Sequence, residues 1–193
     1  ETAPFPMTVL SQKGEWKGTL DKLIAYWTFL RTVDDNAIVA FVDAFDVFGN
    51  RISGHELLRR FYSFGRPVVI STEENIFPRE VEAQAEPAVE FYGKLGGNVS
   101  APSRYINAGG IIGYGWALRY MYMDMEKHMV AHQPELLQSH ADLTGHWFLH
   151  AYDQYELWRF FVRHVMAAHD EGAELLVALD TEQLIFGSTV FVK

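Results

Sequence analysis

The chain has 193 residues, of which 49% are hydrophobic and 15% aromatic, so it is long and apolar enough to form one domain with a substantial core. Its formal net charge is −9, which argues against nucleic acid as the main partner because phosphate-backbone binding needs clustered Lys and Arg. Cysteine is absent, which excludes disulfides and thiol chemistry, and no apolar run is long enough to span a bilayer. We therefore expect a single globular domain over residues 1–193.

Hydrophobic spacing predicts an alternation of helices and short strands. Residues 6–10 are typical of a short strand, and apolar side chains at helical spacing from Thr19 onwards predict an amphipathic helix. The apolar run 38–42 predicts a buried strand, and Ser53 with Glu56 three residues later forms a capping box that begins the next helix. Further strands are expected over 68–70, 105–113 and 175–179, and further helices over 116–133 and 153–169. Because the strands are continuously apolar and alternate with helices, we expect an α/β fold with a mostly parallel sheet flanked by helices.

Residues 72–104 differ from the rest of the chain because they hold several glutamates and prolines and show no clear hydrophobic period. So long a segment without secondary structure in a compact domain is usually an active-site loop or lid, and a disordered insertion is the alternative. The segment also contains Asn98-Val99-Ser100, an N-glycosylation sequon, although such triplets often arise by chance.

Two carboxylates, Asp43 and Asp46, follow the apolar run 38–42. Open α/β sheets bind ligands beyond the carboxyl ends of their strands, and paired oxygen ligands suit a hard divalent cation that keeps open positions for phosphate oxygens. A metal–diphosphate site is therefore the leading hypothesis. The alternative is a strand followed by a turn with solvated aspartates.

Small residues interrupt the expected strand 105–113 at Asn107, Gly109 and Gly110. Glycine weakens a strand, so a pair of glycines indicates a bulge or a backbone that another group approaches closely. A sugar ring or phosphate lying on the main chain would explain the pair, and a packing contact with the neighbouring helix explains it about equally well.

Asp153 and Gln154 lie at the expected start of the last helix. A carboxylate there is favoured by the helix dipole and can act simply as a cap. In a sugar-binding site, Asp153 could instead orient an acceptor hydroxyl or stabilise positive charge at an anomeric carbon. Tyr152, beside it, is a candidate for the wall of a pocket.

Taken in order, several segments resemble the glycosyltransferase domain of the procollagen lysyl hydroxylase and collagen galactosyltransferase group. The matching segments are Gly14-Glu15-Trp16, Phe41 to Val47, Val68 to Glu73, Phe77-Pro78, Tyr105 to Gly113, Asp153-Gln154, Leu179-Asp180 and Ile185-Phe186. No single one is specific, but their order and spacing together are considerably more so.

The resemblance implies a GT-A-like, Rossmann-like fold that uses a UDP-sugar and Mn²⁺ or another divalent cation. By this resemblance, Asp43 and Asp46 are metal ligands, and Asp153 corresponds to the last Asp of a D-D-Q motif that serves catalysis. The segment with Asn107, Gly109 and Gly110 corresponds to residues beside the donor sugar. Other candidate site residues implied by the resemblance are Glu73 at the start of the active-site loop, Phe77, Gln154 and Tyr152.

The chain departs from the family pattern at several places. Tyr152 replaces the first Asp of the D-D-Q motif, and Phe77 replaces the usual Trp. The family's first βα unit and its C-terminal tail, with a third metal ligand, have no counterpart here, so we expect a domain that is incomplete at both ends. No signal peptide is visible, and a secretory-pathway location is expected only if the chain follows the animal family.

We therefore expect a metal-dependent glycosyltransferase that moves galactose or glucose from a UDP-sugar to a hydroxyl acceptor such as hydroxylysine. Its partners would be the nucleotide-sugar donor and a protein or glycan acceptor, with no nucleic acid and no membrane span. The alternatives are a non-catalytic sugar- or nucleotide-binding relative and a metal-dependent hydrolase that uses the same carboxylates.

Overall fold

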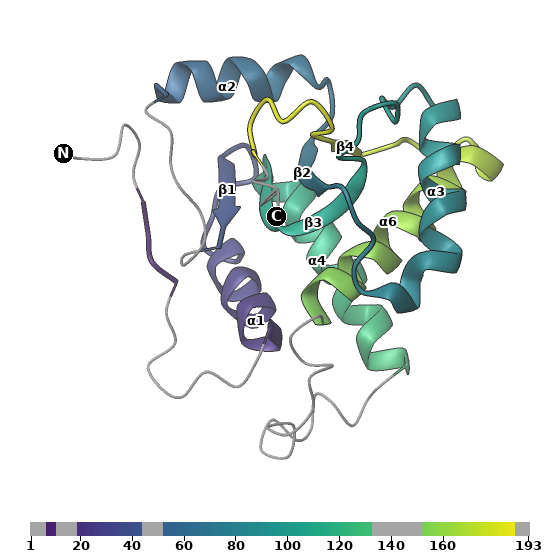
Figure 1. The fold of residues 1–193 in the computed structure, drawn as a ribbon. Coiled ribbons are helices and arrows are strands. Elements are labelled where there is room, and N and C mark those ends of the chain that lie inside the picture. Colours follow the sequence, from purple (N-terminus) through teal and green to yellow (C-terminus); the bar gives the residue numbers. More distant parts are fainter. Residues whose placement is uncertain (1–6, 11–18, 44–51, 133–151, 188–193) are drawn as a thin grey trace, which may run out of the picture.

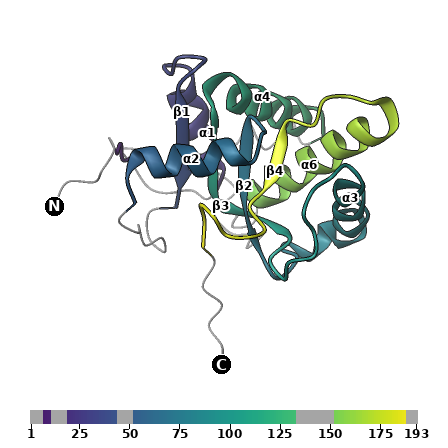
Figure 2. The same ribbon diagram turned by 90° about the horizontal axis from the view of Figure 1, so that it is seen from above.

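Four strands form one sheet in the part of the chain that the computed structural model describes, which is residues 7–10, 19–43, 52–132 and 152–187. The strands are β1 (Ile38–Val42), β2 (Val68–Glu73), β3 (Tyr105–Tyr114) and β4 (Val177–Leu179). The α-helices are α1 (Thr19–Leu30), α2 (Gly54–Ser63), α3 (Glu82–Lys94), α4 (Gly115–His132) and α6 (Tyr152–Glu171), and one 3₁₀ turn, η1 (Arg79–Val81), precedes α3. Figures 1 and 2 show α2 on one side of the sheet and the other helices on the opposite side.

The strand order is β1–β3–β2–β4, with β3 antiparallel to both of its neighbours and only β2 and β4 parallel. The predicted α/β class with flanking helices is confirmed, and the sheet is consistent with a GT-A-like domain. The expectation of mostly parallel pairing is wrong for the described strands. Continuous apolar strands report burial on both faces, and an antiparallel strand shows the same pattern when helices cover both faces.

Alternate strand residues supply two hydrophobic clusters. Val68 and Ile70 of β2 point into the larger cluster, which α1, α3, α4 and α6 cover, whereas Val69 points into the smaller cluster beside Phe61 of α2. The alternation follows from the two-residue period of side chains along a strand. The sheet is therefore the middle layer of three.

Helix α6 is the centre of the larger cluster. It contacts α1, α3, α4 and β3, and its Trp158 and Phe161 are completely buried. Because α6 is fixed by this packing, the residues at its first turn are held rigidly against the sheet. None of the helices in the described ranges combines the length and apolar character needed to cross a membrane.

Three local expectations can be compared with the structure. The Ser53 hydroxyl accepts a hydrogen bond from the Glu56 backbone N–H, so the predicted N-cap of α2 is confirmed, whereas the Glu56 carboxylate, expected to complete a capping box, pairs with Arg59 and Arg60. Residues 7–10 form no strand, and the strand predicted there is wrong over these residues. Residues 72–104 are not a long loop: η1 and α3 form there, because the buried side chains Ala85, Ala88, Val89 and Tyr92 recur at helical spacing.

Gly115, the first residue of α4, allows the turn before β1 to lie close against the start of this helix. Its N–H donates to the Ala37 carbonyl at 2.8 Å, and a β-carbon at this position would overlap the Asp34 carbonyl oxygen. We expect Gly115→Ala to lower the free energy of unfolding by about 1–3 kcal/mol, since backbone cannot move aside cheaply. Gly54→Ala is the control, because no atom lies within 4 Å of a β-carbon there. Equal urea midpoints for the two variants would contradict this reading.

Candidate functional site

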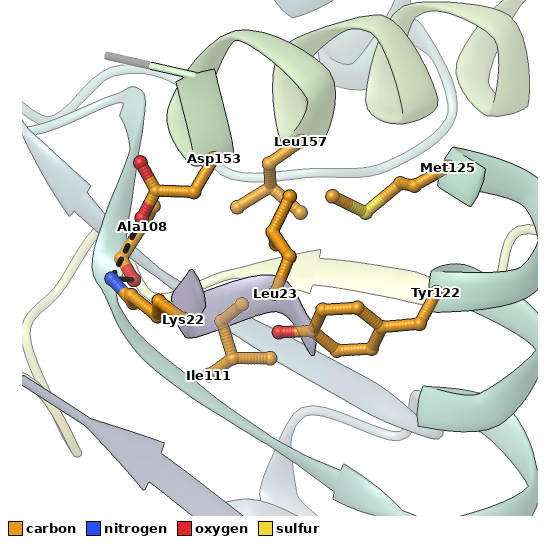
Figure 3. A pocket seen from close by; sticks show the side chains of 8 residues that line it. All are labelled: Lys22, Leu23, Ala108, Ile111, Tyr122, Met125, Asp153 and Leu157. Carbon is orange, nitrogen blue, oxygen red and sulfur yellow. Dashed lines mark hydrogen bonds and ion pairs between the residues drawn. The ribbon is translucent and has the colours of Figure 1, made fainter. Parts of the chain in front are cut away.

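The ammonium group of Lys22 lies at the centre of the site. Its Nζ is 2.6 Å from Asp43 Oδ1 and 2.8 Å from Asp153 Oδ2, and it donates to the Ala108 carbonyl at 3.0 Å. These partners come from the end of β1, the first turn of α6 and the middle of β3. Figure 3 shows Lys22 and Asp153 pointing toward each other across Ala108. Three segments far apart in sequence therefore meet at one cation.

The charge of Lys22 is strongly stabilised. Burial by itself would lower the pKa of this amine, but the nearby carboxylates of Asp153 and Asp43 more than offset burial and raise the pKa above its ordinary value. The neighbouring Tyr26 ring stacks on Phe41 at a centroid distance of 4.0 Å, and burial raises the pKa of Tyr26 to about 12. Lys22 therefore stays protonated, and Tyr26 stays neutral, across the physiological pH range.

Asp43 extends the pairing of β1 with β3 by one residue. Its N–H donates to the Gly109 carbonyl at 3.0 Å, so its side chain is fixed above Gly109. A β-carbon at Gly109 would lie 3.3 Å from Asp43 Oδ2 and 2.7 Å from Asn107 Oδ1. The missing side chain at Gly109 leaves the space that these two polar groups share.

Gly110 has a different role from Gly109. A β-carbon at Gly110 would lie only 2.5 Å from the Phe186 ring, so this glycine is explained by packing. Asp180 holds the turn that carries Phe186: its carboxylate accepts hydrogen bonds from the backbone N–H groups of Leu184, Ile185 and Phe186 at 2.7–2.8 Å. A packing contact therefore explains Gly110, although its partner lies in the turn after β4 and not in the neighbouring helix that the sequence suggested.

The side-chain amide of Gln154 connects three parts of the site. Its Oε1 accepts from the Ala108 N–H at 3.1 Å, and its Nε2 donates to Glu73 Oε1 at 2.6 Å and to the Phe77 carbonyl at 2.9 Å. The side chain is buried, and its polar atoms are occupied by the protein. Gln154 therefore holds β3, the end of β2 and the following loop together, rather than presenting a free amide to a ligand.

Asn107 and Glu73 complete this network. Asn107 Oδ1 accepts from the Gly109 N–H at 2.7 Å, and the Ser71 hydroxyl donates to the Asn107 carbonyl at 2.7 Å. Burial raises the pKa of Glu73, while hydrogen bonds from Gln154 and Asn107 act in the opposite direction. The candidate residues from β2, β3 and α6 thus form one connected set of hydrogen bonds.

The space beneath Lys22 is small. A cavity of about 10 Å³ lies between α1, α4, α6 and β3, with Lys22, Asp153 and Tyr122 among its lining residues. That volume holds at most about one water molecule. A sugar or nucleotide therefore does not fit there, and a ligand would have to approach from the side where Asp43 is exposed.

The remaining candidate residues lie around this set. The Phe77 side chain is 46% exposed, although its carbonyl is held by Gln154. Tyr152 begins α6, next to Asp153. Asp46 lies outside the described residues. Within the described ranges, no group of three His, Asp or Glu side chains is placed to hold a metal ion.

Asp43 nevertheless has the properties of one ligand in a metal site. Its side chain is 35% exposed, and only its Oδ1 is taken by Lys22, so Oδ2 faces Gly109 as a hard oxygen donor. Cations such as Mg²⁺ are commonly held by one or two carboxylates, with waters and substrate phosphates as the other ligands. The chemistry of Asp43 therefore fits a divalent cation bound together with a diphosphate.

Sequence reasoning missed Lys22. Its signal was a charged residue within the apolar spacing of α1, adjacent to buried Leu23 and one turn before buried Tyr26. A lysine on a buried helix face needs acidic partners. The sequence offered many acidic residues, and only the fold selects Asp43 and Asp153.

A mixed α/β sheet with a carboxylate just beyond the end of one strand, beside a glycine-containing strand, is consistent with a GT-A-like domain. Over residues 5–132 the chain matches the family model of the PLOD GT domain, the glycosyltransferase domain of the procollagen lysyl hydroxylases. This match covers more than half of the chain, so the protein belongs to that family and has a glycosyltransferase-related function. No curated protein matches the chain. Asp153 and Gln154 lie beyond the matched residues, yet they contact residues within them.

Replacing Lys22 tests whether its ammonium supports the fold. Lys22→Met leaves two carboxylates facing each other without a cation, so we expect a loss of about 3–5 kcal/mol in the free energy of unfolding, measured in urea at neutral pH. Lys94→Met is the matched control, since Lys94 pairs with Glu90 on the exposed surface and should change stability far less. A Lys22→Met variant as stable as the control would show that the ion pairs contribute nothing.

The raised pKa of Glu73 predicts a pH dependence of stability. The folded state binds this proton more tightly than the unfolded chain, so Glu73 costs stability as the pH rises from the ordinary glutamate value, about 4.3, through the folded-state value. Glu73→Gln keeps an oxygen that can accept from Gln154 and does not ionise. Urea midpoints should therefore show the variant gaining stability relative to wild type between about pH 4 and pH 7.

Glu90→Gln is a control of opposite sign. A hydrogen bond from Lys94 lowers the pKa of Glu90, so this carboxylate stabilises the fold at neutral pH, and the stabilisation is lost as the pH falls. The Glu90→Gln variant should lose stability relative to wild type as the pH rises toward the ordinary glutamate value of about 4.3, and its difference from wild type should change little from there to pH 7. Parallel profiles for the two variants would rule out the assignment to Glu73.

Proposed function

We propose that the domain transfers a hexose, galactose or glucose, from a UDP-sugar to a hydroxyl acceptor such as hydroxylysine. One observation carries this proposal: Asp43, Asp153 and the Ala108 carbonyl converge on Lys22, although they come from three separate segments, and Gly109 lies beside Asp43. Family membership supports the general class of reaction. The hydroxyl acceptor then needs a carboxylate that orients it. The nucleotide-sugar donor needs a site where a cation binds its diphosphate.

A divalent cation, Mn²⁺ in the first instance, is proposed to bind at Asp43 together with Asp46. The partial exposure of Asp43 and its hard oxygen donor support this assignment. When bound, the cation would neutralise charge on the diphosphate leaving group. Gly109, without a side chain, leaves room for the Asp43 carboxylate and the Asn107 side-chain amide beside the proposed cation site.

Asp153 is proposed to orient the acceptor hydroxyl. Its carboxylate is fixed on one side by Lys22 and on the other by the Gln154 N–H, which donates to Oδ1 at 2.9 Å. Fixed orientation is what a positioning or general-base carboxylate needs. Lys22 and Gln154 act as positioning residues in this scheme. Gln154 also holds Glu73 and the Phe77 carbonyl, and the exposed Phe77 side chain is proposed to contact the acceptor.

A non-catalytic donor-binding relative is the second candidate. Lys22 neutralises the same two carboxylates that transfer would use, and the cavity beside it is too small for a sugar. Both observations also suit a scaffold that binds a nucleotide or sugar at the surface without reacting. The third possibility from the sequence, a metal-dependent hydrolase, would use these carboxylates to activate water.

Ligand-dependent thermal stability tests donor and metal binding. UDP and UDP-sugars with Mn²⁺ should raise the melting temperature, since a ligand at about 100 times its Kd adds about 2.7 kcal/mol to the stability of the folded state. Asp43→Asn should lose the Mn²⁺-dependent part of the rise. Glu90→Gln, which removes one exposed carboxylate elsewhere, should keep it. An equal metal-dependent rise in the Asp43→Asn variant would remove Asp43 from the proposed site.

Product analysis separates the three candidates. Incubation with UDP-galactose or UDP-glucose, Mn²⁺ and a hydroxylysine peptide should give UDP and a glycosylated peptide. Free sugar without glycosylated peptide would favour the hydrolase. Binding without release of UDP would favour the non-catalytic relative.

A further inference from the structure

The loop between α3 and β3 presents Asn98-Val99-Ser100 to solvent. The Val99 side chain turns inward and packs where Gly93 of α3 leaves room, since a β-carbon at Gly93 would lie 2.9 Å from a Val99 methyl group. Its neighbours on either side, Asn98 and Ser100, are both exposed.

The two polar side chains of this triplet are already in contact. The Ser100 hydroxyl donates to Asn98 Oδ1 at 2.9 Å, and the Ser100 N–H donates to the same oxygen at 3.2 Å. These bonds fix the amide plane of Asn98 and leave its Nδ2 on the outer side. That nitrogen donates to Glu182 Oε1 at 2.8 Å, an exposed residue just after β4.

We propose that Asn98 is an acceptor site for an N-linked oligosaccharide. The triplet meets the requirement of Asn-X-Ser with X other than proline. In the transfer, Asn98 Nδ2 forms a bond to C1 of the first sugar, and the bond from C1 to the diphosphate of a lipid-linked oligosaccharide donor breaks. The lipid diphosphate leaves with the electron pair, and one amide proton passes to a base of the transferring enzyme. This modification is independent of the proposed transferase activity.

The fold accommodates such a modification without a change in its core. A glycosylated amide keeps one N–H, which can still donate to Glu182. The loop is held to the turn after β4 by a second bond, from Gln183 Nε2 to Ser103 Oγ at 2.9 Å, which does not involve the sequon. A glycan at Asn98 would therefore project into solvent beside this turn.

Expression of the full chain behind a cleavable signal peptide in a eukaryotic cell tests the proposal. Asn98 belongs to the only sequon in the sequence, so a mobility shift removed by peptide N-glycosidase reports on this residue alone. Mass spectrometry after enzymatic release in heavy-oxygen water should identify labelled Asp at position 98. Ser100→Thr should retain the shift, and Ser100→Ala and Asn98→Gln should abolish it.

The protein retained inside the cell is analysed with the secreted protein, because transfer takes place before export. Melting temperatures of the variants made without a signal peptide show that each still folds. A signal-cleaved chain whose Asn98 is unmodified, while a standard sequon in the same cells is occupied, would overturn the proposal. A shift that persists in Ser100→Ala would overturn it as well.

Discussion

The buried ammonium of Lys22 is the interaction on which the arrangement of the site depends. A lysine has three N–H donors, and here three oxygens receive them: those of Asp43, Asp153 and the Ala108 carbonyl. Removing two carboxylates and an ammonium from water is costly, and it is tolerated only when each group finds charged or hydrogen-bonded partners. Because Lys22 lies on α1 and its partners lie at the end of β1, on β3 and on α6, these contacts hold α1 against the other three elements.

A second network holds the backbone around that point. Gln154 joins the end of β2, the loop after it and β3 through one side-chain amide, and Asn107 bonds the N–H of Gly109. Because these bonds are buried or partly buried, losing one partner would leave a polar group shielded from water without a hydrogen bond. The site is therefore rigid where Asp153 lies, and it is open to solvent mainly at Asp43 and Phe77.

Rigidity of this kind is what transfer between two bound substrates requires. Catalysis by orientation needs carboxylates that do not move away from the reacting hydroxyl. The same ion pairs that stabilise the fold lower the negative charge available to a cation or an acceptor. In the proposed transferase, Lys22 therefore positions the Asp43 and Asp153 carboxylates and also offsets part of their negative charge. The negative charge that remains decides whether the site supports transfer or only binding.

The sequence by itself determined where several of the local elements begin and which carboxylate follows β1. The Ser53 cap, the position of Asp43 directly after β1 and the start of α6 near Asp153 all follow from short-range patterns. Only the tertiary structure decided the mixed strand pairing, the partners of Lys22 and the contact of Phe186 with Gly110. These features depend on which distant segments meet. Hydrophobic period and residue type report burial, but they do not report the identity of a long-range partner.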